Sequence, residues 1–202
     1  MPNAQDVVPA RKRGRPTEAE RAQRLDDILG SAVRLFVDRG FESVTLDDIA
    51  AAAHVTKRTI YTHIGDRTEV FLAAVERLGD RALRDVRPEA GLDELAQHVV
   101  RALYSDDAIG LHRLVIGESR RFPQLAARFY DEGPRRYIAA LRSRLPADDA
   151  AAETLFGLLL GEPHRRRLLG LDPEPSPAAA VSRAREALAL LRIAPTTPED
   201  AR

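Results

Sequence analysis

Cysteine is absent from the 202 residues of this chain, tryptophan is absent as well, and only 5% of the residues are aromatic. The lack of cysteine excludes disulfides, a thiol nucleophile and zinc–thiolate sites. No secretion-signal apolar segment stands near the N-terminus, and the longest apolar run, residues 155–160, is far shorter than the roughly 20 residues that span a bilayer. We therefore expect a cytoplasmic protein that has no contact with a membrane.

The chain also lacks net charge, because 31 basic residues balance 31 acidic ones. A general attraction to nucleic acid is thereby excluded, but the local distribution of charge is uneven. Residues 11–24 carry six basic side chains against two acidic ones, and residues 54–64 contain Lys57 and Arg58 with no acid. Both positive segments lie in the first third of the chain.

Alanine, leucine and arginine dominate the sequence and β-branched runs are scarce, which favours helix throughout. Apolar residues recur at spacings of three and four, so we predict an all-α protein. Three helices are expected within residues 20–64. Further helices are expected near 67–86, 92–105, 107–121, 123–145, 148–168 and 177–192. Gly133-Pro134 leaves open whether residues 123–145 form one helix or two.

Capping residues set the expected limits of the first helices. Gly40 is placed to end the first helix in a left-handed conformation. Thr45, with Asp48 three residues later, has the pattern of a capping box for the second helix. Thr56 is the N-cap candidate of the third, and Asp66 precedes the fourth.

Two short helices joined by a tight turn, at residues 45–53 and 56–64, are typical of a helix-turn-helix, whose second helix enters the DNA major groove. Val55, Ile60 and Ile64 are spaced to attach this second helix to a small core. The remaining side chains are hydroxyl-bearing or basic, with one tyrosine phenol, and such groups suit the phosphate oxygens and base edges of DNA. The solvated face of an ordinary amphipathic helix would have a similar periodicity, and that interpretation stays open here.

The stretch from Gly40 to Phe71 resembles the DNA-binding domain of the TetR family of bacterial transcriptional regulators. The resemblance rests on "LFVDRGFESVT" followed by "TLDDIAAAAHVTKRTIYTHIGDRTEVF", including Ile49, Ala50, Ala53, Val55, Thr56, Tyr61, His63 and Phe71. It implies an N-terminal helix-turn-helix domain, residues 20–66, and a helical domain, residues 67–202, that binds an effector and dimerises. It further implies a repressor that binds a palindromic operator as a dimer and releases it when a small molecule binds.

Matching positions imply the roles of individual residues in DNA binding. The candidates in the helix-turn-helix are Thr45, Thr56, Lys57, Arg58, Thr59, Tyr61, Thr62 and His63. Two positions depart from the family pattern. His54 stands where the turn usually has glycine, and Ile64 stands where phenylalanine is usual. Histidine tolerates the positive φ of such a turn at some cost in strain.

We expect residues 1–19 to form a disordered basic arm. Its "KRGRP" resembles the core of an AT-hook, in which arginines such as Arg13 and Arg15 enter a narrow A·T minor groove. A solubilising tail would have the same composition. The arm also leaves an alternative function open, namely an architectural DNA-binding protein without an effector.

The remainder of the chain lacks a metal-binding histidine motif, a phosphate-binding loop and a nucleophile elbow, so we expect no enzyme, no metal and no cofactor. An all-helical enzyme that carries a helix-turn-helix would need such a constellation. The segment from Glu118 to Leu145 resembles the C-terminal domain of an AefR-like TetR subgroup. Candidate pocket residues are Leu95, His98, Val99, Leu103, Leu111, His112, Val115, Glu118, Phe122, Phe129 and Tyr130.

Two stretches near the C-terminus are the expected dimer helices, namely "AAETLFGLLLG", residues 151–161, and "AAVSRAREALALLRI", residues 179–193. The first is apolar on nearly all sides, which exceeds what packing on one subunit requires. Two such pairs meeting about a two-fold axis would form a four-helix bundle. The expected partners are therefore double-stranded DNA, a second copy of the chain and a small-molecule effector.

Overall fold

The computed structural model describes residues 17–84, 86–87, 90–145 and 149–191, and in these ranges the chain is helical with no strand. The all-α prediction is confirmed. The helices are α1 (Glu18–Arg39), α2 (Leu46–Ala52), α3 (Lys57–His63), α4 (Arg67–Arg84), α5 (Leu92–Tyr104), α6 (Asp106–Glu118), α7 (Pro123–Glu132), α8 (Pro134–Arg142), α9 (Asp149–Leu168) and α10 (Pro177–Leu190).

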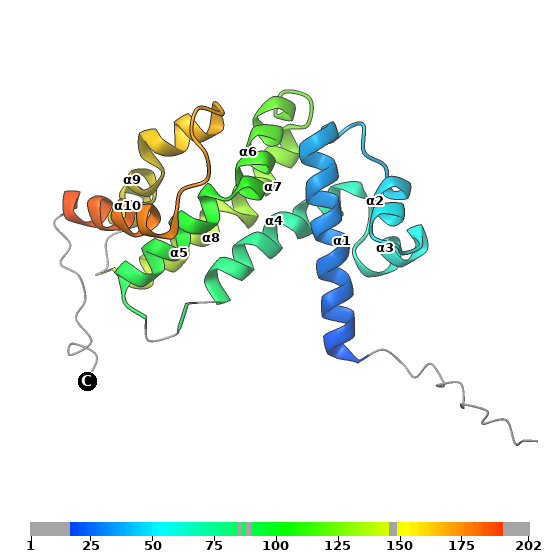
Figure 1. The fold of residues 1–202 in the computed structure, drawn as a ribbon, viewed down its shortest axis with the longest axis horizontal. Helices are drawn as coiled ribbons and strands as arrows, with labels where there is room; N and C mark the ends of the chain where they lie inside the picture. Colours follow the sequence, from blue (N-terminus) through cyan, green and yellow to red (C-terminus); the bar gives the residue numbers. More distant parts are fainter. Residues whose placement is uncertain (1–16, 85, 88–89, 146–148, 192–202) are drawn as a thin grey trace, which may run out of the picture.

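Helices α1, α2 and α3 form one end of an elongated molecule, and α9 and α10 form the other (Figure 1). The predicted caps are present. Thr45 and Asp48 form a capping box at α2, and Thr56 caps α3 through the Thr59 amide. Gly40 follows α1 with φ of 81° and donates its N–H to the carbonyl of Phe36. Such a φ strains a side chain with a Cβ but not glycine, which explains why the helix ends there.

Helix α1 begins at Glu18, and Thr17 caps it in a capping box with Glu20. Residues 18 and 19, which the sequence analysis assigned to the arm, are therefore helical. The rest of that arm, residues 1–16 with Arg13 and Arg15, lies outside the described residues. The predicted division at residue 66 stays a prediction.

Two apolar cores are present, and the first contains residues from both sides of the predicted division at residue 66. The first combines α1, α2, α3 and the first half of α4 with Leu111 and Val115 of α6 and Leu125 of α7. The second is built from α5, α8, α9 and α10. Residues of α6 and α7 therefore share a core with the helix-turn-helix, although more than forty residues separate them in sequence.

The interval 123–145 is two helices, as one of the two sequence interpretations had it. Gly133 separates α7 from α8, with φ of −109° and ψ of −93°, and Pro134 occupies the first turn of α8. Proline is tolerated in that turn because its missing N–H would be unpaired anyway. The break lets α7 join the first core and α8 the second.

Helix α9 is kinked, which the sequence analysis did not predict. Gly161 has φ of 53° and ψ of −159°, and Pro163 follows it without an N–H to donate. The freed carbonyls find donors from other helices. Arg183 of α10 donates to the carbonyls of Leu158 and Leu159, and the Tyr104 hydroxyl donates to those of Leu159 and Leu160. The kink thus ties α9 to α5 and α10.

Candidate nucleic-acid interface and internal cavity

Helix α3 is attached to the first core on one side only. Ile60 is fully buried, and the half-buried Val55 and Ile64 pack against the same core. Tyr61, the residue after Ile60, is 63% exposed. The other exposed side chains of this helix are Lys57, Arg58, Thr62 and His63. The predicted division of the helix into an attached face and an exposed polar face is present.

The turn that orients α3 contains a strained residue. His54 has φ of 54°, and among the described residues it is the only non-glycine with positive φ. The turn is closed by the Val55 N–H, which donates to the Ala50 carbonyl at 3.0 Å. The turn therefore keeps the conformation that glycine usually supplies, and His54 adopts it at a cost of about 1–2 kcal/mol.

The threonines at the helix starts are partly occupied by capping. The hydroxyl oxygens of Thr56 and Thr59 lie 2.8 Å apart, and Thr59 is half-buried. The Thr45 hydroxyl bonds the Asp48 carboxylate and accepts from the Asp48 amide. Thr45 and Thr56 are exposed at the same time, so each hydroxyl is held in place at the surface.

The surface around α3 is less purely basic than its own sequence. The Lys57 ammonium lies 2.8 Å from a carboxylate oxygen of Asp47 on α2, and both side chains are more than half exposed. An exposed pair of this kind contributes about 0–1 kcal/mol, so it orients Lys57 without holding it tightly. The sequence did not reveal this acid because it lies on the neighbouring helix.

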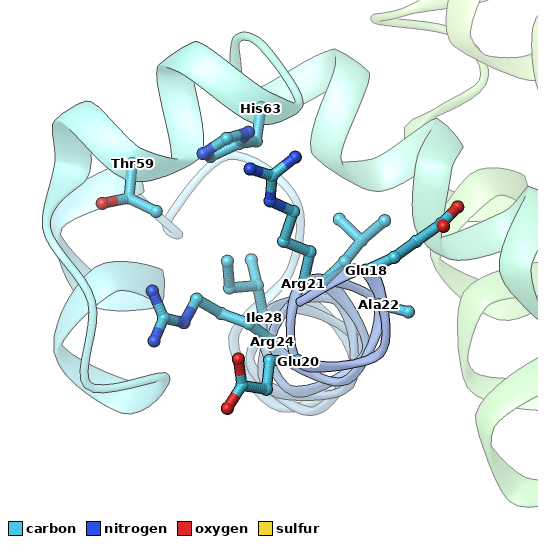
Figure 2. Close-up of a pocket in the computed structure, with 9 residues that line it drawn as sticks. Glu18, Glu20, Arg21, Ala22, Arg24, Ile28, Thr59 and His63 are labelled. Atoms are coloured by element: carbon cyan, nitrogen blue, oxygen red, sulfur yellow. The ribbon is translucent and has the colours of Figure 1, made fainter. Parts of the chain in front are cut away.

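Two arginines that the sequence analysis did not select lie beside the same surface. Arg21 and Arg24 of α1 line a groove of about 640 Å³ together with Thr59 and His63 of α3. Figure 2 shows both guanidinium groups extending from α1 toward α3. The signal for them was the basic segment 11–24, but periodicity alone did not place α1 next to α3.

A cavity of about 50 Å³, partly open to solvent, lies in the other half of the molecule. Helices α4 to α8 all contribute to its walls. The residues are Val75, Leu78, Gly79, Leu103, Ala108, Leu111, His112, Phe129, Gly133, Pro134 and Tyr137. An apolar cavity of about 150 Å³ holds benzene, so this one is too small for an aromatic ring as it stands.

The structure brings four of the predicted pocket residues to this cavity, namely Leu103, Leu111, His112 and Phe129. The others lie outside its lining. Leu95 and Val99 are in the second core, Val115 is in the first core and Phe122 packs against it, Tyr130 is 48% exposed, and His98 and Glu118 are half-buried. Tyr137 was not predicted, although its spacing of four from the buried Leu141 was a signal that it faces inward.

His112 connects the cavity to a row of buried rings. Its imidazole centroid lies 5.6 Å from that of Phe129 and 5.5 Å from that of His164, which in turn lies 5.3 Å from Tyr104. Burial lowers the pKa of His112. Burial, with His112 nearby, also lowers the pKa of His164, to about 4. Both imidazoles are therefore neutral at pH 7.

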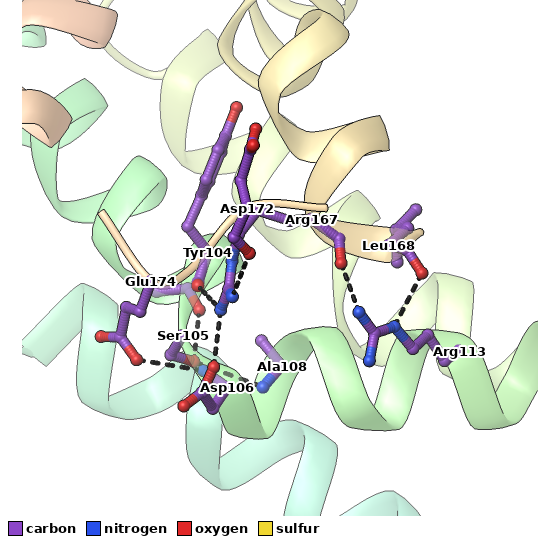
Figure 3. A network of polar contacts seen from close by, with 10 residues as sticks. Tyr104, Ser105, Asp106, Ala108, Arg113, Arg167, Leu168, Asp172 and Glu174 are labelled. Carbon is purple, nitrogen blue, oxygen red and sulfur yellow. Dashed lines mark hydrogen bonds and ion pairs between the residues drawn. The ribbon is translucent and has the colours of Figure 1, made fainter. Parts of the chain in front are cut away.

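A polar network beside these rings fixes the end of α9 (Figure 3). The buried guanidinium of Arg167 donates to the carbonyls of Tyr104 and Asp172 and pairs with the Asp106 carboxylate at 2.8 Å. Arg113 of α6 donates to the carbonyls of Leu168 and Arg167. The bonds from Arg113 give carbonyls at the C-terminal end of α9 a donor from α6, and the Arg167 carbonyl also accepts from the Gly170 N–H.

Two family profiles match the chain in succession. Residues 28–74 match the profile described as bacterial regulatory proteins, tetR family. Residues 90–192, half of the chain, match the profile of the C-terminal domain of the AefR-like transcriptional repressor. The chain belongs to the TetR family.

Individual TetR-family relatives agree. The HTH-type transcriptional repressor Rv3405c of Mycobacterium tuberculosis is 30% identical over 152 residues, which cover 72% of this chain and 77% of the relative. The Flavonoid-responsive Regulator FrrA superposes with a TM-score of 0.60 and 25% identity, over 88% of this chain and 99% of FrrA. A TetR transcriptional regulator from Agrobacterium tumefaciens has a TM-score of 0.63 at 24% identity, over 89% and 98% of the chains, which shows the shared fold.

Membership of the TetR family confirms the predicted fold of an N-terminal helix-turn-helix domain followed by a helical domain. It also confirms the prediction of a transcriptional regulator rather than an enzyme, because the matched relatives are regulators. TetR-family regulators bind DNA and act as dimers with small-molecule effectors. Across the ranges that the structure describes, no helix is both long and apolar enough to span a membrane.

The strain at His54 leads to a stability prediction. Changing His54→Gly should raise the free energy of unfolding by up to about 1 kcal/mol, because glycine adopts positive φ without strain. His54→Val should lower it by about 1–2 kcal/mol, because a β-branched side chain fits this conformation poorly. Urea unfolding measures both. The matched control is Ala52→Gly in α2, where φ is helical and glycine should destabilise by about 1 kcal/mol. Equal effects of the two glycine changes would contradict the argument.

Burial of His164 predicts a dependence of stability on pH. Its pKa is about 4 in the folded chain and 6.5 when unfolded, so the unfolded state binds the proton more tightly. The difference in the pKa of His164 adds to the free energy of unfolding, and this addition is fully present above pH 6.5. It is lost as the pH falls toward 4, to a total of about 3 kcal/mol. Unfolding free energies measured between pH 7.5 and 4.5 should fall less steeply for His164→Gln than for the unchanged chain. If the unfolding free energies of the two chains fell equally with pH, His164 would not be the cause of the pH dependence.

Proposed function

We propose that this TetR-family regulator is a ligand-responsive repressor that binds a palindromic operator as a homodimer. The observation that carries the proposal is α3. Ile60 anchors the helix with no exposed surface, while Lys57, Arg58 and Tyr61 are exposed to solvent. A short rigid helix with hydroxyls, bases and a phenol on its free face suits the major groove.

The DNA contacts follow from this orientation. Lys57 and Arg58 stand at the start of α3, where a recognition helix reaches base edges. Tyr61, Thr62 and His63 are exposed further along and suit the phosphate backbone. Of the other predicted contacts within the described residues, Thr45 and Thr56 are the N-caps of α2 and α3, and the Thr59 hydroxyl lies beside that of Thr56. Hydroxyls held there suit phosphate oxygens. Arg21 and Arg24 of α1 line the groove beside α3 together with Glu18 and Glu20, and the two arginines are the side chains there that suit phosphate contacts.

Repression and an effector are supported by the relatives. Rv3405c is named a repressor, and the profile matched by residues 90–192 is that of a repressor's C-terminal domain. FrrA is named for its response to flavonoids, which are small molecules. The cavity beneath α6 and α7 is the place for such a molecule, because it is apolar and has a few polar groups.

The dimer surface that we propose consists of the outer sides of α9 and α10. The large apolar residues Leu155, Phe156 and Leu159 of α9 face inward, so the exposed side of this helix is smaller and more polar than the sequence suggested. Gly157 is exposed there, and a Cβ added to it would meet nothing within 4 Å. Leu190 of α10 is 67% exposed. Small residues let a partner helix approach closely, and burying an exposed leucine in the interface favours association because apolar surface leaves water.

Operator binding tests the role of α3. The full chain is used to retain genomic DNA fragments, and the bound fragments are sequenced. We expect a small set that shares an inverted repeat. On that sequence, Lys57→Ala and Tyr61→Ala should each weaken binding by about tenfold, because each removes a contact worth about 1–3 kcal/mol. Fluorescence anisotropy at fixed salt concentration gives the affinities.

The control for these variants is Arg101→Ala, which removes an exposed positive charge from α5, far from α3. It should leave operator affinity unchanged. An equal loss in Arg101→Ala and Lys57→Ala would mean that charge, not position, governs binding. Recovery of A·T-rich DNA without a shared repeat would instead favour the architectural function.

Oligomeric state tests the dimer. The unchanged chain should have the mass of a dimer in light scattering, and Gly157→Arg should have that of a monomer. Arginine is the better helix former, so this change blocks the approach of a partner without weakening α9 itself. Ala127→Arg, at an exposed position of α7, is the matched control and should stay dimeric. A dimer that survives Gly157→Arg would place the interface elsewhere.

A further inference from the structure

The structure identifies a chemical class for the effector. We propose that the cavity between α4 and α8 takes an uncharged aromatic compound that carries a hydroxyl group. This inference rests on the proposed ligand response, since it names the ligand of the same site.

The lining has no charged side chain. Its walls are aliphatic and aromatic groups from α4, α5, α6 and α7, and its polar side chains are His112 and Tyr137. An ionised ligand placed there would lose its hydration without gaining an opposite charge, which is strongly unfavourable. The cavity therefore selects against carboxylates, phosphates and ammonium groups.

A charged pair stands near the cavity in sequence but outside its lining. Arg136, next to Tyr137 in sequence, pairs with Asp80 and lies 3.8 Å from a carboxylate oxygen of Glu76. Neither Arg136 nor Asp80 lines the cavity. The buried Nη1 of Arg136 has no hydrogen-bond partner within the described residues, but Glu76 and Asp80 already face the guanidinium, so a ligand carboxylate would meet two acids there.

His112 and Tyr137 supply the recognition of a hydroxyl group. Tyr137 is only 4% exposed, and burial raises its pKa to about 12, so the phenol keeps its proton and can donate. His112 stays neutral, so its imidazole has one donor and one acceptor nitrogen. Within the described part of the chain, neither side chain forms a hydrogen bond. His112 is half-buried, and neither side chain has an enclosed polar atom that lacks a partner, so water can bind both and a ligand oxygen can take its place.

The walls favour a flat molecule. Phe129 and His112 lie at 35° to each other with centroids 5.6 Å apart, and Tyr137 adds a third ring to the lining. Rings stack or meet edge to face at such distances, so an aromatic ligand would make the same kind of contact with these side chains. Because the cavity is now about 50 Å³, the ligand must displace a wall, and α7 ends at the Gly133 break beside it.

Three compounds with one skeleton test the class, namely 4-propylphenol, propylbenzene and 4-propylbenzoate. Binding to the full chain at pH 7 is measured by calorimetry. We expect the phenol to bind about tenfold more tightly than propylbenzene, because only the phenol pairs the buried polar groups. The benzoate should show no binding in the same range of concentration.

A pair of variants locates the contact. Tyr137→Phe removes one oxygen and keeps the ring, so it should weaken 4-propylphenol about tenfold and leave propylbenzene unaffected. Tyr130→Phe is the matched control, because Tyr130 lies 48% exposed on α7, outside the cavity, and should bind all compounds like the unchanged chain.

The outcomes separate this inference from the proposed function. Binding of the benzoate, phenol binding that Tyr137→Phe does not change, or no binding of any of the three compounds would overturn the effector class and leave ligand response intact. Release of operator DNA by 4-propylphenol is measured separately by anisotropy. A phenol that binds through Tyr137 but never releases DNA would support the chemistry of the cavity and overturn the ligand response.

Discussion

Contact among four phenylalanines fixes the DNA-binding helices to the rest of the molecule. Phe36 comes from α1, Phe41 from the segment before α2, Phe71 from α4 and Phe122 from the start of α7, and adjacent ring centroids lie 5.4–5.7 Å apart. Burial of such rings is among the largest single contributions to a small core. Since α3 is attached mainly through Ile60, the position of its exposed face depends on this cluster.

The same cluster provides a physical link between the cavity and the DNA-binding surface. Helix α7 carries Phe129 in the cavity wall, and two turns earlier Phe122 contacts Phe41. An ion pair between Arg121 and Glu42 runs beside that contact. A ligand that enlarges the cavity by displacing α7 would therefore act on the segment just before α2. Packed cores shift between discrete arrangements, so a small displacement there can reorient α3.

The helices could be predicted because their signals are local. Thr45 with Asp48, Thr56 and Gly40 mark ends that depend only on neighbouring backbone groups, and the structure has each of them. What escaped prediction depends on distant partners. The kink at Gly161 persists because Arg183 and Tyr104 satisfy the carbonyls it frees, and no spacing in the sequence reveals that. Periodicity likewise shows that one side of α6 is buried, but not which core it enters.

The two candidate sites differ in how far the sequence reveals them, for the same reason. The α3 surface could be predicted because its chemistry lies in one short stretch of sequence. The cavity could be predicted only in part, because residues from five helices form it and burial changes their properties. Leu103, Leu111, His112 and Phe129 were among the candidates. Burial lowers the pKa of His112, and its ring neighbours Phe129 and His164 stand far from it in the chain. A sequence names the side chain, whereas its charge, and with it the class of ligand, is decided by the side chains that the fold places around it.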